Sequence, residues 1–548
     1  MNKEIILPKL TLKELINNAV DSFSEYPSVS FVEGKPLTYS KLGSEIERIA
    51  DLLATMGLQK GDKVALYSHN MPNWVIAFFA VVSKGMIIVP VLPDFSAEEI
   101  KNVLDHSESK VLFVSERLLP RIAEDANLLN VIRLDDLTVI RGPIPVTTEK
   151  SADVDVHEDD VAAIIYTSGT TGRSKGVMLT HKNITFVAAG SFHVTSINHE
   201  DVFLSFLPLS HTYENSIGML YPVMYGASIY YLEKPPTAAA LLPALAKIRP
   251  TMMLSVPLIM EKIFKVQVQG KFTKNHFSRM IYKTPLFRKI IHRIAGKKLY
   301  QTFGGRLKFF GIGGAKLDAR VERFLKEARM PYAIGYGLTE TAPLLAGAAP
   351  NQTKLQSTGY AIRGVELKIH EPDKRGVGEI WAKGPNVMVG YYKNPEATAE
   401  VLTQDGWFRT GDFGKFDSSK RLFIKGRQKN VIIGAGGENI YPEDIESIIN
   451  NSHYVLESLV VEEDGYLVAK ILLDIEHIEK QYVHLKTIIE EKKDQYHEWL
   501  EHLKKDINNT LNKNSQVRKV EVMDKPFEKT ASQKIKRFLY SKSPGKKK

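Results

Sequence analysis

Apolar residues follow two different periods over the first 115 residues. Three segments place them at helical spacing, and three segments between these are short and rich in aliphatic residues. The predicted helices are Ser40–Met56, Asn73–Lys84 and Ser96–Asp105. The predicted strands are Lys63–Ser68, Ile87–Val91 and Lys110–Ser115. Strands that alternate with helices of this length are typical of a parallel sheet in an α/β fold.

Capping signals predict two further helices. Thr11 stands three residues before Glu14, in the form of a capping box, so a helix is expected to begin there. Thr180 is placed to cap a helix that runs to about Phe192. The stretch 132–158 is polar and without a clear period, and we expect it to connect the elements on either side.

The C-terminal part has a different pattern. Apolar runs predict strands at Ser458–Glu462 and Tyr466–Leu473. A long stretch of interleaved charges from about Ile475 to Asn512 predicts a helix with a solvated face. Strands and a helix that follow each other in this way favour a small α+β unit.

The clearest chemical signal is the loop after a buried strand predicted at Val161–Ile165. From Thr167 to Gly176 every residue is Gly, Ser, Thr, Arg or Lys. Glycines let backbone N–H groups point inward, hydroxyls add donors, and Arg173 and Lys175 add positive charge, so the loop suits a polyphosphate. A plain surface loop is the alternative, because such clusters commonly are loops. A Walker A loop is excluded, since Gly172 is not followed by Lys and Ser or Thr.

The sequence TSGTTGRSKGV in this loop resembles the phosphate loop of the adenylate-forming superfamily, which includes acyl-CoA synthetases, luciferases and peptide-synthetase adenylation domains. Further motifs of that superfamily follow in its order, so that the resemblance covers about residues 12 to 537. It implies ATP as a substrate. The residues it implies for ATP binding in this loop are Thr167, Ser168, Gly169, Thr170, Thr171, Gly172 and Lys175.

The segment Ala333-IGYGLTET341 resembles a second motif of the superfamily. The resemblance implies that Tyr336 stacks on adenine, Thr339 contacts phosphate, and Glu340 together with Thr167 holds Mg²⁺. An aromatic face suits a purine, and a carboxylate beside phosphate oxygens suits Mg²⁺. Taken alone, these letters could be a plain strand and turn. The flanking glycines assigned to the nucleotide site are Gly335 and Gly337.

Motifs nearer the C-terminus match as well, beginning with Gly390-YYKNPEAT398 and Trp407-FRTGD412. The resemblance implies that Asp412 binds the ribose hydroxyls and that Arg427 reaches the ribose or a phosphate. Lys429 falls at the hinge. The remaining assignments place Gly437 beside the pantetheine arm of coenzyme A and make Lys534 the catalytic lysine, although Gln533 replaces the usual glycine before it.

The fold implied by the resemblance has two parts. Residues 1–426 form a large α/β domain of sheets flanked by helices, which binds ATP and the acyl substrate. Residues 427–429 form a hinge, and residues 430–548 form a small, mobile α+β domain that carries Lys534. The implied reaction joins a carboxylic acid to ATP, giving an acyl-adenylate and pyrophosphate, and then passes the acyl group to coenzyme A.

A fatty acid, long-chain by resemblance, is the predicted substrate. The stretches Leu204–Tyr231 and Leu241–Phe264 are rich in Leu, Met, Ile, Val and Tyr, and an apolar pocket suits a fatty acid. The segment LPLSHTYE resembles long-chain fatty acyl-CoA synthetases and places His211 beside the acyl pocket, as a candidate catalytic residue. The alternatives are a medium-chain or aryl acid ligase, transfer to a carrier protein, or a non-catalytic fatty-acid or nucleotide-binding protein.

Composition narrows the setting. The chain has 548 residues and no cysteine, which excludes disulfides and thiolate chemistry, and its first residues lack the apolar run of a signal peptide. The net charge is +10, but Lys262–Leu317 alone carries 14 Lys and Arg and no Asp or Glu, which leaves −4 for the rest. We therefore expect a cytoplasmic protein without a nucleic-acid module, whose basic stretch 262–317 makes peripheral contact with the inner, anionic face of a membrane. The alternatives for this stretch are packing on the large domain or attraction of coenzyme A or nucleic acid.

Overall fold

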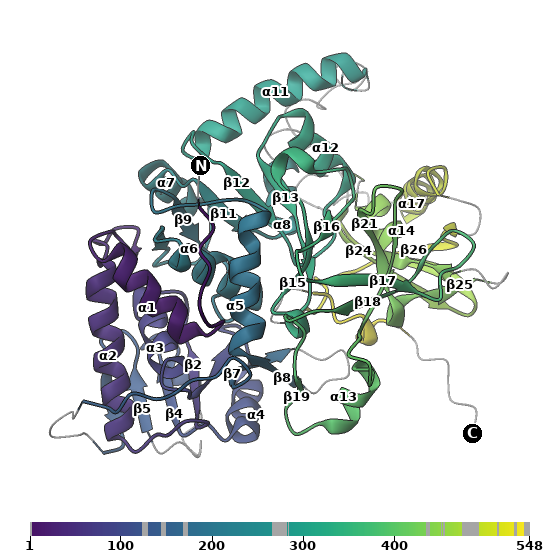
Figure 1. Cartoon of the computed structure of the whole chain (residues 1–548). Coiled ribbons are helices and arrows are strands. Elements are labelled where there is room, and N and C mark those ends of the chain that lie inside the picture. The colour runs from purple at the N-terminus through teal and green to yellow at the C-terminus, as the bar shows by residue number, and fades with distance from the viewer. Residues whose placement is uncertain are drawn as a thin grey trace. The chain divides into compact units, whose positions relative to one another are not determined.

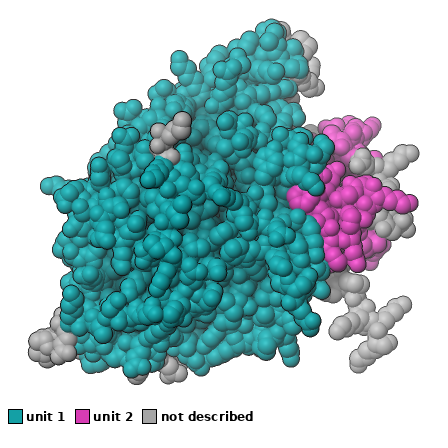
Figure 2. Space-filling model, in the orientation of Figure 1, with its two compact units in different colours: residues 1–368, 381–410, 417–422 teal, residues 369–380, 411–416, 423–548 magenta. Residues whose placement is uncertain are grey.

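The structure is a computed structural model, and the residues it describes are 3–122, 130–143, 150–167, 174–265, 282, 284–434, 439–450, 452, 455–473, 493–511, 515–530 and 534–541. The chain divides into two compact units (Figures 1 and 2). Unit 1 comprises residues 1–368, 381–410 and 417–422, and unit 2 comprises residues 369–380, 411–416 and 423–548. Both units combine helices with sheets, which confirms the predicted mixed α/β class.

An eight-stranded sheet forms one half of unit 1. Its order is β19 (Gly390–Tyr391), β8 (Lys175–Thr180), β7 (Val161–Thr167), β3 (Ile87–Val91), β2 (Lys63–Tyr67), β4 (Val111–Val114), β5 (Asn130–Arg133) and β6 (Thr138–Arg141). The five strands from β7 to β5 run parallel, but β8, β19 and β6 add antiparallel pairs at the two ends. The three strands predicted over the first 115 residues are β2, β3 and β4, and they run parallel as expected. The expected connection over 132–158 is wrong in part, because it contributes to β5 and β6.

The helices of this half begin and end close to the predicted residues. They are α1 (Leu12–Phe23), α2 (Tyr39–Thr55), α3 (Pro72–Val82) and α4 (Ala97–Ser107). The Thr11 side chain accepts a hydrogen bond from the N–H of Glu14, as the capping pattern predicts. Gly57 and Gly85, which follow α2 and α3, have φ of +82° and +70°, where glycine carries no steric cost. Helix α3 is buried along its length because it packs on α1, α2 and the strands beneath.

A six-stranded parallel sheet forms the other half of unit 1. Its order is β1 (Val29–Phe31), β10 (Ser228–Tyr231), β9 (Val202–Ser205), β11 (Met252–Ser255), β12 (Phe309–Ile312) and β13 (Tyr332–Ile334). Helix α5 (His181–Gly190), capped by Thr180 as predicted, contacts β7 and β8 of the first sheet. It also contacts a buried π-helical segment, η3 (Glu214–Leu220), which in turn contacts β9 and β11. The two sheets are thus joined through α5 and η3.

Further helices of unit 1 lie around the second sheet: α6 (Tyr221–Met224), α7 (Ala238–Ile248), α8 (Pro257–Phe264), α11 (Pro285–Thr302) and α12 (Ala319–Glu327). A small sheet of β14 (Tyr336–Gly337), β15 (Leu344–Gly347) and β16 (Tyr360–Ala361) follows β13, and α13 (Pro395–Val401) follows β19. None of the helices in the described ranges combines the length and apolarity needed to span a bilayer.

Unit 2 has its own core. A sheet of β24 (Val455–Glu463), β25 (Tyr466–Leu473) and β26 (Lys519–Val522) packs with α14 (Pro442–Ile449) and α17 (Lys493–Asn508). Both predicted strands are confirmed, and α17 falls within the predicted helix, whose residues 475–492 lie outside the described ranges. The strands β17 (Glu366–His370), β18 (Gly378–Lys383), β20 (Phe408–Phe416) and β21 (Leu422–Arg427) form a further sheet, whose residues are divided between the two units. In unit 2, β22 (Ile432–Ile433) pairs with β23 (Asn439–Ile440). The predicted boundary at 426 and hinge at 427–429 stay predictions.

Candidate active site

A β-hairpin at the edge of the parallel strands holds the predicted phosphate loop. Strands β7 and β8 pair antiparallel from Val161 and Thr180 down to Thr167 and Lys175, the last pair before the loop. The Thr167 hydroxyl lies 3.5 Å from the carbonyl oxygen of Lys175. The loop residues themselves, 168–173, lie outside the described residues. The hairpin therefore fixes both ends of the loop on a buried strand pair.

Lys175, Tyr391 and Glu340 come together beside this hairpin. The Lys175 ammonium lies 4.7 Å from the centroid of the Tyr391 ring, close enough for a cation–π interaction. The Tyr391 hydroxyl donates a hydrogen bond of 2.9 Å to Oε1 of Glu340. The backbone of Glu340 is also fixed, because its carbonyl accepts from the N–H of Met388 at 2.9 Å. One predicted phosphate ligand and the predicted metal ligand thus share a neighbour, Tyr391, which strand β19 places next to β8.

The turn that carries Tyr336 and Glu340 is tightly packed. A Cβ atom on Gly337 would lie 1.7 Å from the carbonyl oxygen of Pro343, so only glycine fits there. The Thr341 hydroxyl bonds to the backbone at Leu338 and Pro343, and Thr339 and Glu340 lie in the short 3₁₀ turn Thr339–Thr341. Tyr336 is half-buried, while Gly337 is exposed. The local sequence therefore builds a rigid platform that presents Tyr336, Thr339 and Glu340.

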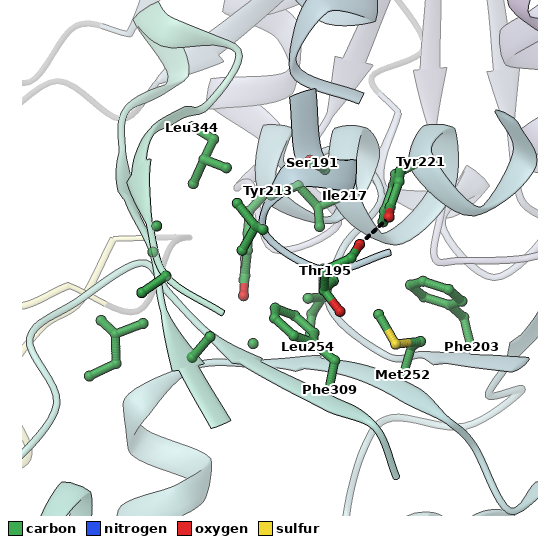
Figure 3. A pocket seen from close by; sticks show the side chains of 17 residues that line it. Ser191, Thr195, Phe203, Tyr213, Ile217, Tyr221, Met252, Leu254, Phe309 and Leu344 are labelled. Carbon is green, nitrogen blue, oxygen red and sulfur yellow. Dashed lines mark hydrogen bonds between the residues drawn. The ribbon is translucent and has the colours of Figure 1, made fainter. Parts of the chain in front are cut away.

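An apolar cavity lies next to this platform (Figure 3). Its wall comes from β9, β11, β12, β13 and β15, from η3 and α6, and from the residues that follow α5. The cavity extends to Gly335, the residue before Tyr336. The principal lining side chains are Ser191, Thr195, Phe203, Tyr213, Ile217, Tyr221, Met252, Leu254, Phe309 and Leu344.

Small residues and tyrosines shape this cavity. A Cβ atom on Gly311 would lie 2.9 Å from the Tyr213 hydroxyl and 2.8 Å from Leu254, so the glycine leaves room for both side chains. The Tyr221 hydroxyl donates to the carbonyl oxygen of Thr195, which closes one side of the cavity (Figure 3). Because that hydroxyl is satisfied by the backbone, the wall it forms is effectively apolar.

His211 precedes the cavity residue Tyr213 by two positions in the sequence. Its Nδ1 accepts a 3.3 Å hydrogen bond from the backbone N–H of Tyr213, which leaves the proton of a neutral ring on Nε2. Tyr213, two residues later, is part of the cavity wall, whereas His211 is not among the lining residues. The sequence thus points to the right segment, and the role of His211 stays a prediction.

Glu214, the next residue after Tyr213, is fully buried at the start of η3. Burial raises the pKa of this carboxyl from 4.5 to about 8, and a hydrogen bond with Ser205 only partly offsets the effect. Asn70 donates to the same Ser205 hydroxyl and to the carbonyl oxygen of Leu207. A neutral, protonated Glu214 therefore belongs to a buried polar chain behind the cavity wall.

In unit 2, Asp412 and Arg427 form an ion pair. Asp412 lies on β20 and Arg427 on the neighbouring β21, and Nε of the guanidinium is 2.9 Å from Oδ1 of the carboxylate. The Asp412 side chain is only 7% exposed, and a buried carboxylate gains from a paired cation. Lys429 follows in the 3₁₀ turn Gln428–Asn430 and is exposed. Gly437 lies outside the described residues.

The backbone of Lys534, also in unit 2, is bonded to Thr530. The Thr530 N–H donates to the carbonyl oxygen of Lys534 at 2.8 Å, and the N–H of Lys534 lies 3.3 Å from the Thr530 hydroxyl. Phe527 and Ile535 pack with the sheet of β24 and β25 on either side of these two residues. The backbone at Thr530 and Lys534 is therefore firmly fixed, while residues 531–533, including Gln533, lie outside the described residues.

Sequence reasoning missed several of these contacts. Tyr391 belongs to a quoted motif but was assigned no role, and the Ser191–Thr195 and Leu344–Ala348 parts of the cavity wall were not anticipated. The apolar stretches Leu204–Tyr231 and Leu241–Phe264 were indicated for the pocket, and the wall includes residues of both. The contribution of Tyr391 follows from the pairing of β19 with β8, which the sequence does not show.

Comparison with known proteins shows which family the chain resembles. The family model described as AMP-binding enzyme matches residues 16–392. The long-chain-fatty-acid–CoA ligase FadD15 of Mycobacterium bovis is 31% identical over 486 residues, covering 81% of this chain and 78% of the relative. Fatty acyl-CoA synthetase A of Dictyostelium discoideum is 28% identical over 508 residues, covering 82% of this chain and 73% of the relative.

Among solved structures, the o-succinylbenzoate coenzyme A synthetase MenE of Bacillus subtilis in complex with AMP aligns with a TM-score of 0.74. The alignment covers 96% of this chain and 97% of that one at 24% sequence identity. At this identity the likeness concerns the fold alone, and it extends over both units.

Proposed function

Because the chain belongs to the family of AMP-binding enzymes, we propose that it is an AMP-forming fatty acid–CoA ligase. It is an acid–thiol ligase that activates a fatty acid with ATP and transfers the acyl group to a thiol. We further propose that the acid is long-chain and that the thiol is coenzyme A. The names of the related ligases from Mycobacterium bovis and Dictyostelium discoideum support this choice.

The observation that carries the proposal is the apolar cavity beside the nucleotide platform. Its wall is almost free of charge, and it extends to Gly335, one residue before the tyrosine proposed to stack on adenine. An alkyl chain held in the cavity would therefore place its carboxylate near the α-phosphate of a nucleotide on Tyr336. A polar or highly charged acid would lose its hydration there without compensation.

The reaction needs positioning more than a nucleophilic side chain. A carboxylate oxygen attacks the α-phosphorus of ATP, the bond to pyrophosphate breaks, and an acyl-adenylate remains. The thiol of coenzyme A then attacks the acyl carbon, loses its proton, and AMP leaves. Since two anions must approach each other in the first step, the protein contributes mainly orientation and positive charge.

We assign the positive charge to Lys175 at the phosphate loop and to Lys534 at the attacked phosphate. Tyr336 would stack on adenine, and Thr339 would donate to a phosphate oxygen. Asp412, held by Arg427, would accept hydrogen bonds from the ribose hydroxyls, because a buried carboxylate with a fixed partner is a well-oriented acceptor. These roles follow from the family resemblance.

Mg²⁺ fits the residues around Glu340. Within the described ranges no cluster of three or more metal-binding side chains occurs, but Mg²⁺ commonly takes one or two carboxylates together with phosphate oxygens and water. Glu340 is only half-buried, and Tyr391 donates to its Oε1, which limits the rotation of the carboxylate. When bound, Mg²⁺ supplies charge neutralisation on the phosphates. Glu340 would hold it, with Thr167 nearby.

A panel of acids tests the proposal. AMP release is measured with ATP and Mg²⁺ for saturated fatty acids of increasing length, for benzoate and for a dicarboxylate, each with and without coenzyme A. Turnover should rise with chain length and depend on coenzyme A. Rapid turnover of benzoate and none of the fatty acids would instead favour an aryl acid ligase. Turnover that requires an acyl carrier protein in place of coenzyme A would show that the carrier protein supplies the thiol acceptor.

A further inference from the structure

Helix α11 carries a row of exposed apolar side chains. Leu286, Phe287, Ile290 and Ile294 are 66%, 52%, 46% and 64% exposed. With 3.6 residues per turn, their positions span roughly 100° of the helix surface. Isolated exposed apolar residues are ordinary, but four large ones on adjacent turns form a continuous apolar face.

The opposite face of α11 is the one that packs on unit 1. His292, Gly296 and Leu299 are buried, and a Cβ atom on Gly296 would lie 2.4 Å from the Cβ of Ala328, just after α12. Arg288 binds both oxygens of Glu327 on α12 at 2.9 and 3.2 Å. These contacts fix the rotation of α11 about its axis, so the apolar face cannot turn inward. The four side chains of this face therefore do not pack on the large domain, which was the alternative given for the stretch.

Cations flank the apolar face on both sides. Lys289 and Arg293 lie along one edge, Lys298 lies at the other edge, and Lys297 follows the apolar row at its C-terminal end; all four are exposed. Within the described residues, no ion pair engages any of them, and α11 has no acidic residue. The nearest acidic group on α12, Glu327, is already paired with Arg288. Figure 1 shows α11 at the outer edge of unit 1, beside α12.

We propose that α11 docks unit 1 on an anionic lipid surface, with Leu286, Phe287, Ile290 and Ile294 inserted among the lipids and the flanking cations on the headgroups. An apolar face bordered by cations is the arrangement of a helix that lies in a membrane interface. A protein partner would match the apolar row but leave four cations unpaired, and a nucleic acid would match the cations but leave the apolar row in water. The anionic bilayer matches both features.

The proposal also deepens the proposed function. Long-chain fatty acids partition into bilayers, so a ligase that docks there finds its substrate at a high local concentration. Binding to lipid itself needs no ATP, fatty acid or coenzyme A, and it can therefore be measured apart from catalysis. Residues 266–281 and 283, which also belong to the basic stretch, lie outside the described residues and take no part in the argument.

Vesicle co-sedimentation of the full-length protein tests the proposal. The probes are vesicles of phosphatidylcholine alone and of phosphatidylcholine mixed with phosphatidylglycerol, at low and at high salt. The wild type should bind only the mixed vesicles, and more weakly at high salt. Each interfacial cation contributes about a fivefold change in partitioning, so Lys289→Glu/Arg293→Glu should weaken binding by at least about 25-fold.

Two further variants separate the proposal from its alternatives. Leu286→Ser/Ile290→Ser/Ile294→Ser keeps every charge and should still lose about tenfold in vesicle binding, because lipid insertion is lost. Lys35→Glu/Lys234→Glu changes the net charge as much as the α11 charge variant does, at exposed lysines elsewhere, and should bind like the wild type. All variants should activate a water-soluble short-chain acid at the wild-type rate, which would show that they are folded.

Three results would overturn the proposal. The wild type could fail to bind mixed vesicles at low salt. The serine variant could bind them as well as the wild type while duplex DNA displaces both, which would indicate a polyanion site. The serine variant could also abolish a dimer of the wild type without changing vesicle binding, which would assign the apolar face to a second copy of the chain. Vesicle binding without any acid-dependent ATP chemistry would contradict the proposed function and leave the docking surface intact.

Discussion

Tyr391 is the residue that links the phosphate hairpin to the Glu340 turn. Its ring faces the Lys175 ammonium, and its hydroxyl holds one oxygen of Glu340. A hydroxyl that orients a carboxylate limits the positions where that carboxylate can bind a cation. Tyr391 therefore acts as a positioning residue, through Glu340, rather than as a catalytic one.

Replacing Tyr391 by Phe separates its two contacts. The ring and its interaction with Lys175 remain, while the hydrogen bond to Glu340 is lost. We expect the Mg²⁺ concentration for half-maximal AMP release to rise by about three- to tenfold, the range for one hydrogen bond to a partly exposed carboxylate. The KM for the fatty acid should not change. The matched control is Tyr392→Phe, which removes a hydroxyl that lies 3.5 Å from Glu108. This variant should behave as wild type. An unchanged Mg²⁺ requirement in Tyr391→Phe would contradict the role given to Tyr391.

Glu214 predicts a pH-dependent stability. Burial raises the pKa of its carboxyl to about 8 from an ordinary value of 4.5. At a pH between these two values, the folded protein therefore keeps a proton that the unfolded chain has released. The stability contribution is complete below the ordinary value and is lost as pH rises toward the folded pKa, by up to about 1.4 kcal/mol per pH unit.

Glu214→Gln keeps the shape and the hydrogen-bonding capacity but removes the titration. Its melting temperature relative to wild type should therefore increase from about pH 5 to about pH 8. Glu233→Gln, at an exposed position, should show no such trend. A difference that is constant with pH would mean that Glu214 is ionised in the folded protein.

We expect Lys534 to be needed for the first half-reaction and not for the second. Lys534→Ala should abolish adenylate formation, since the attacked phosphate loses its cation, while supplied acyl-adenylate should still react with coenzyme A. Lys525→Ala removes an exposed charge from the same segment and should affect neither step. The measurements are pyrophosphate exchange for the first step and thioester formation from acyl-adenylate for the second. Equal loss of both steps would remove Lys534 from the adenylation chemistry.

At the level of elements, the sequence predicts most of unit 1 because its local signals agree with the packing. Helix ends are marked in the sequence and found in the structure at the capping residues Thr11 and Thr180 and at the glycines Gly57 and Gly85. Strand direction is not local, which is why the antiparallel pairing of β8 with β7 was not foreseen. Strand β5 was overlooked because its apolar core, Val131 and Ile132, is too short to stand out from polar neighbours. Tertiary pairing with β4 decides its conformation.

We expect the Gln428–Asn430 turn to act as the hinge of a domain rearrangement between the two half-reactions. Lys429→Pro would restrict φ in this turn, so we expect adenylation to persist and thioester formation to fall sharply. Lys429→Ala, which keeps backbone freedom, should complete both steps. If the Pro variant forms thioester at the normal rate, the hinge lies elsewhere.

For the whole molecule, motif order identified the family, while the pocket needed the fold. Tyr336, Thr339 and Glu340 lie close together in sequence, so their roles could be predicted from the motif alone. The cavity draws on residues from Ser191 to Ala348, which the parallel strands of the second sheet bring together. The exposed face of α11 likewise depended on the structure, because periodicity shows an amphipathic helix but not which side is buried.

The central claim is that the protein forms an acyl-adenylate from a fatty acid and ATP. Exchange of labelled pyrophosphate into ATP tests it most directly, because exchange requires reversible adenylation and needs no coenzyme A. With a long-chain fatty acid and Mg²⁺ present, we predict rapid exchange that stops when either is omitted. Fatty-acid binding without acid-dependent exchange would contradict the account and would identify a binding protein rather than a ligase.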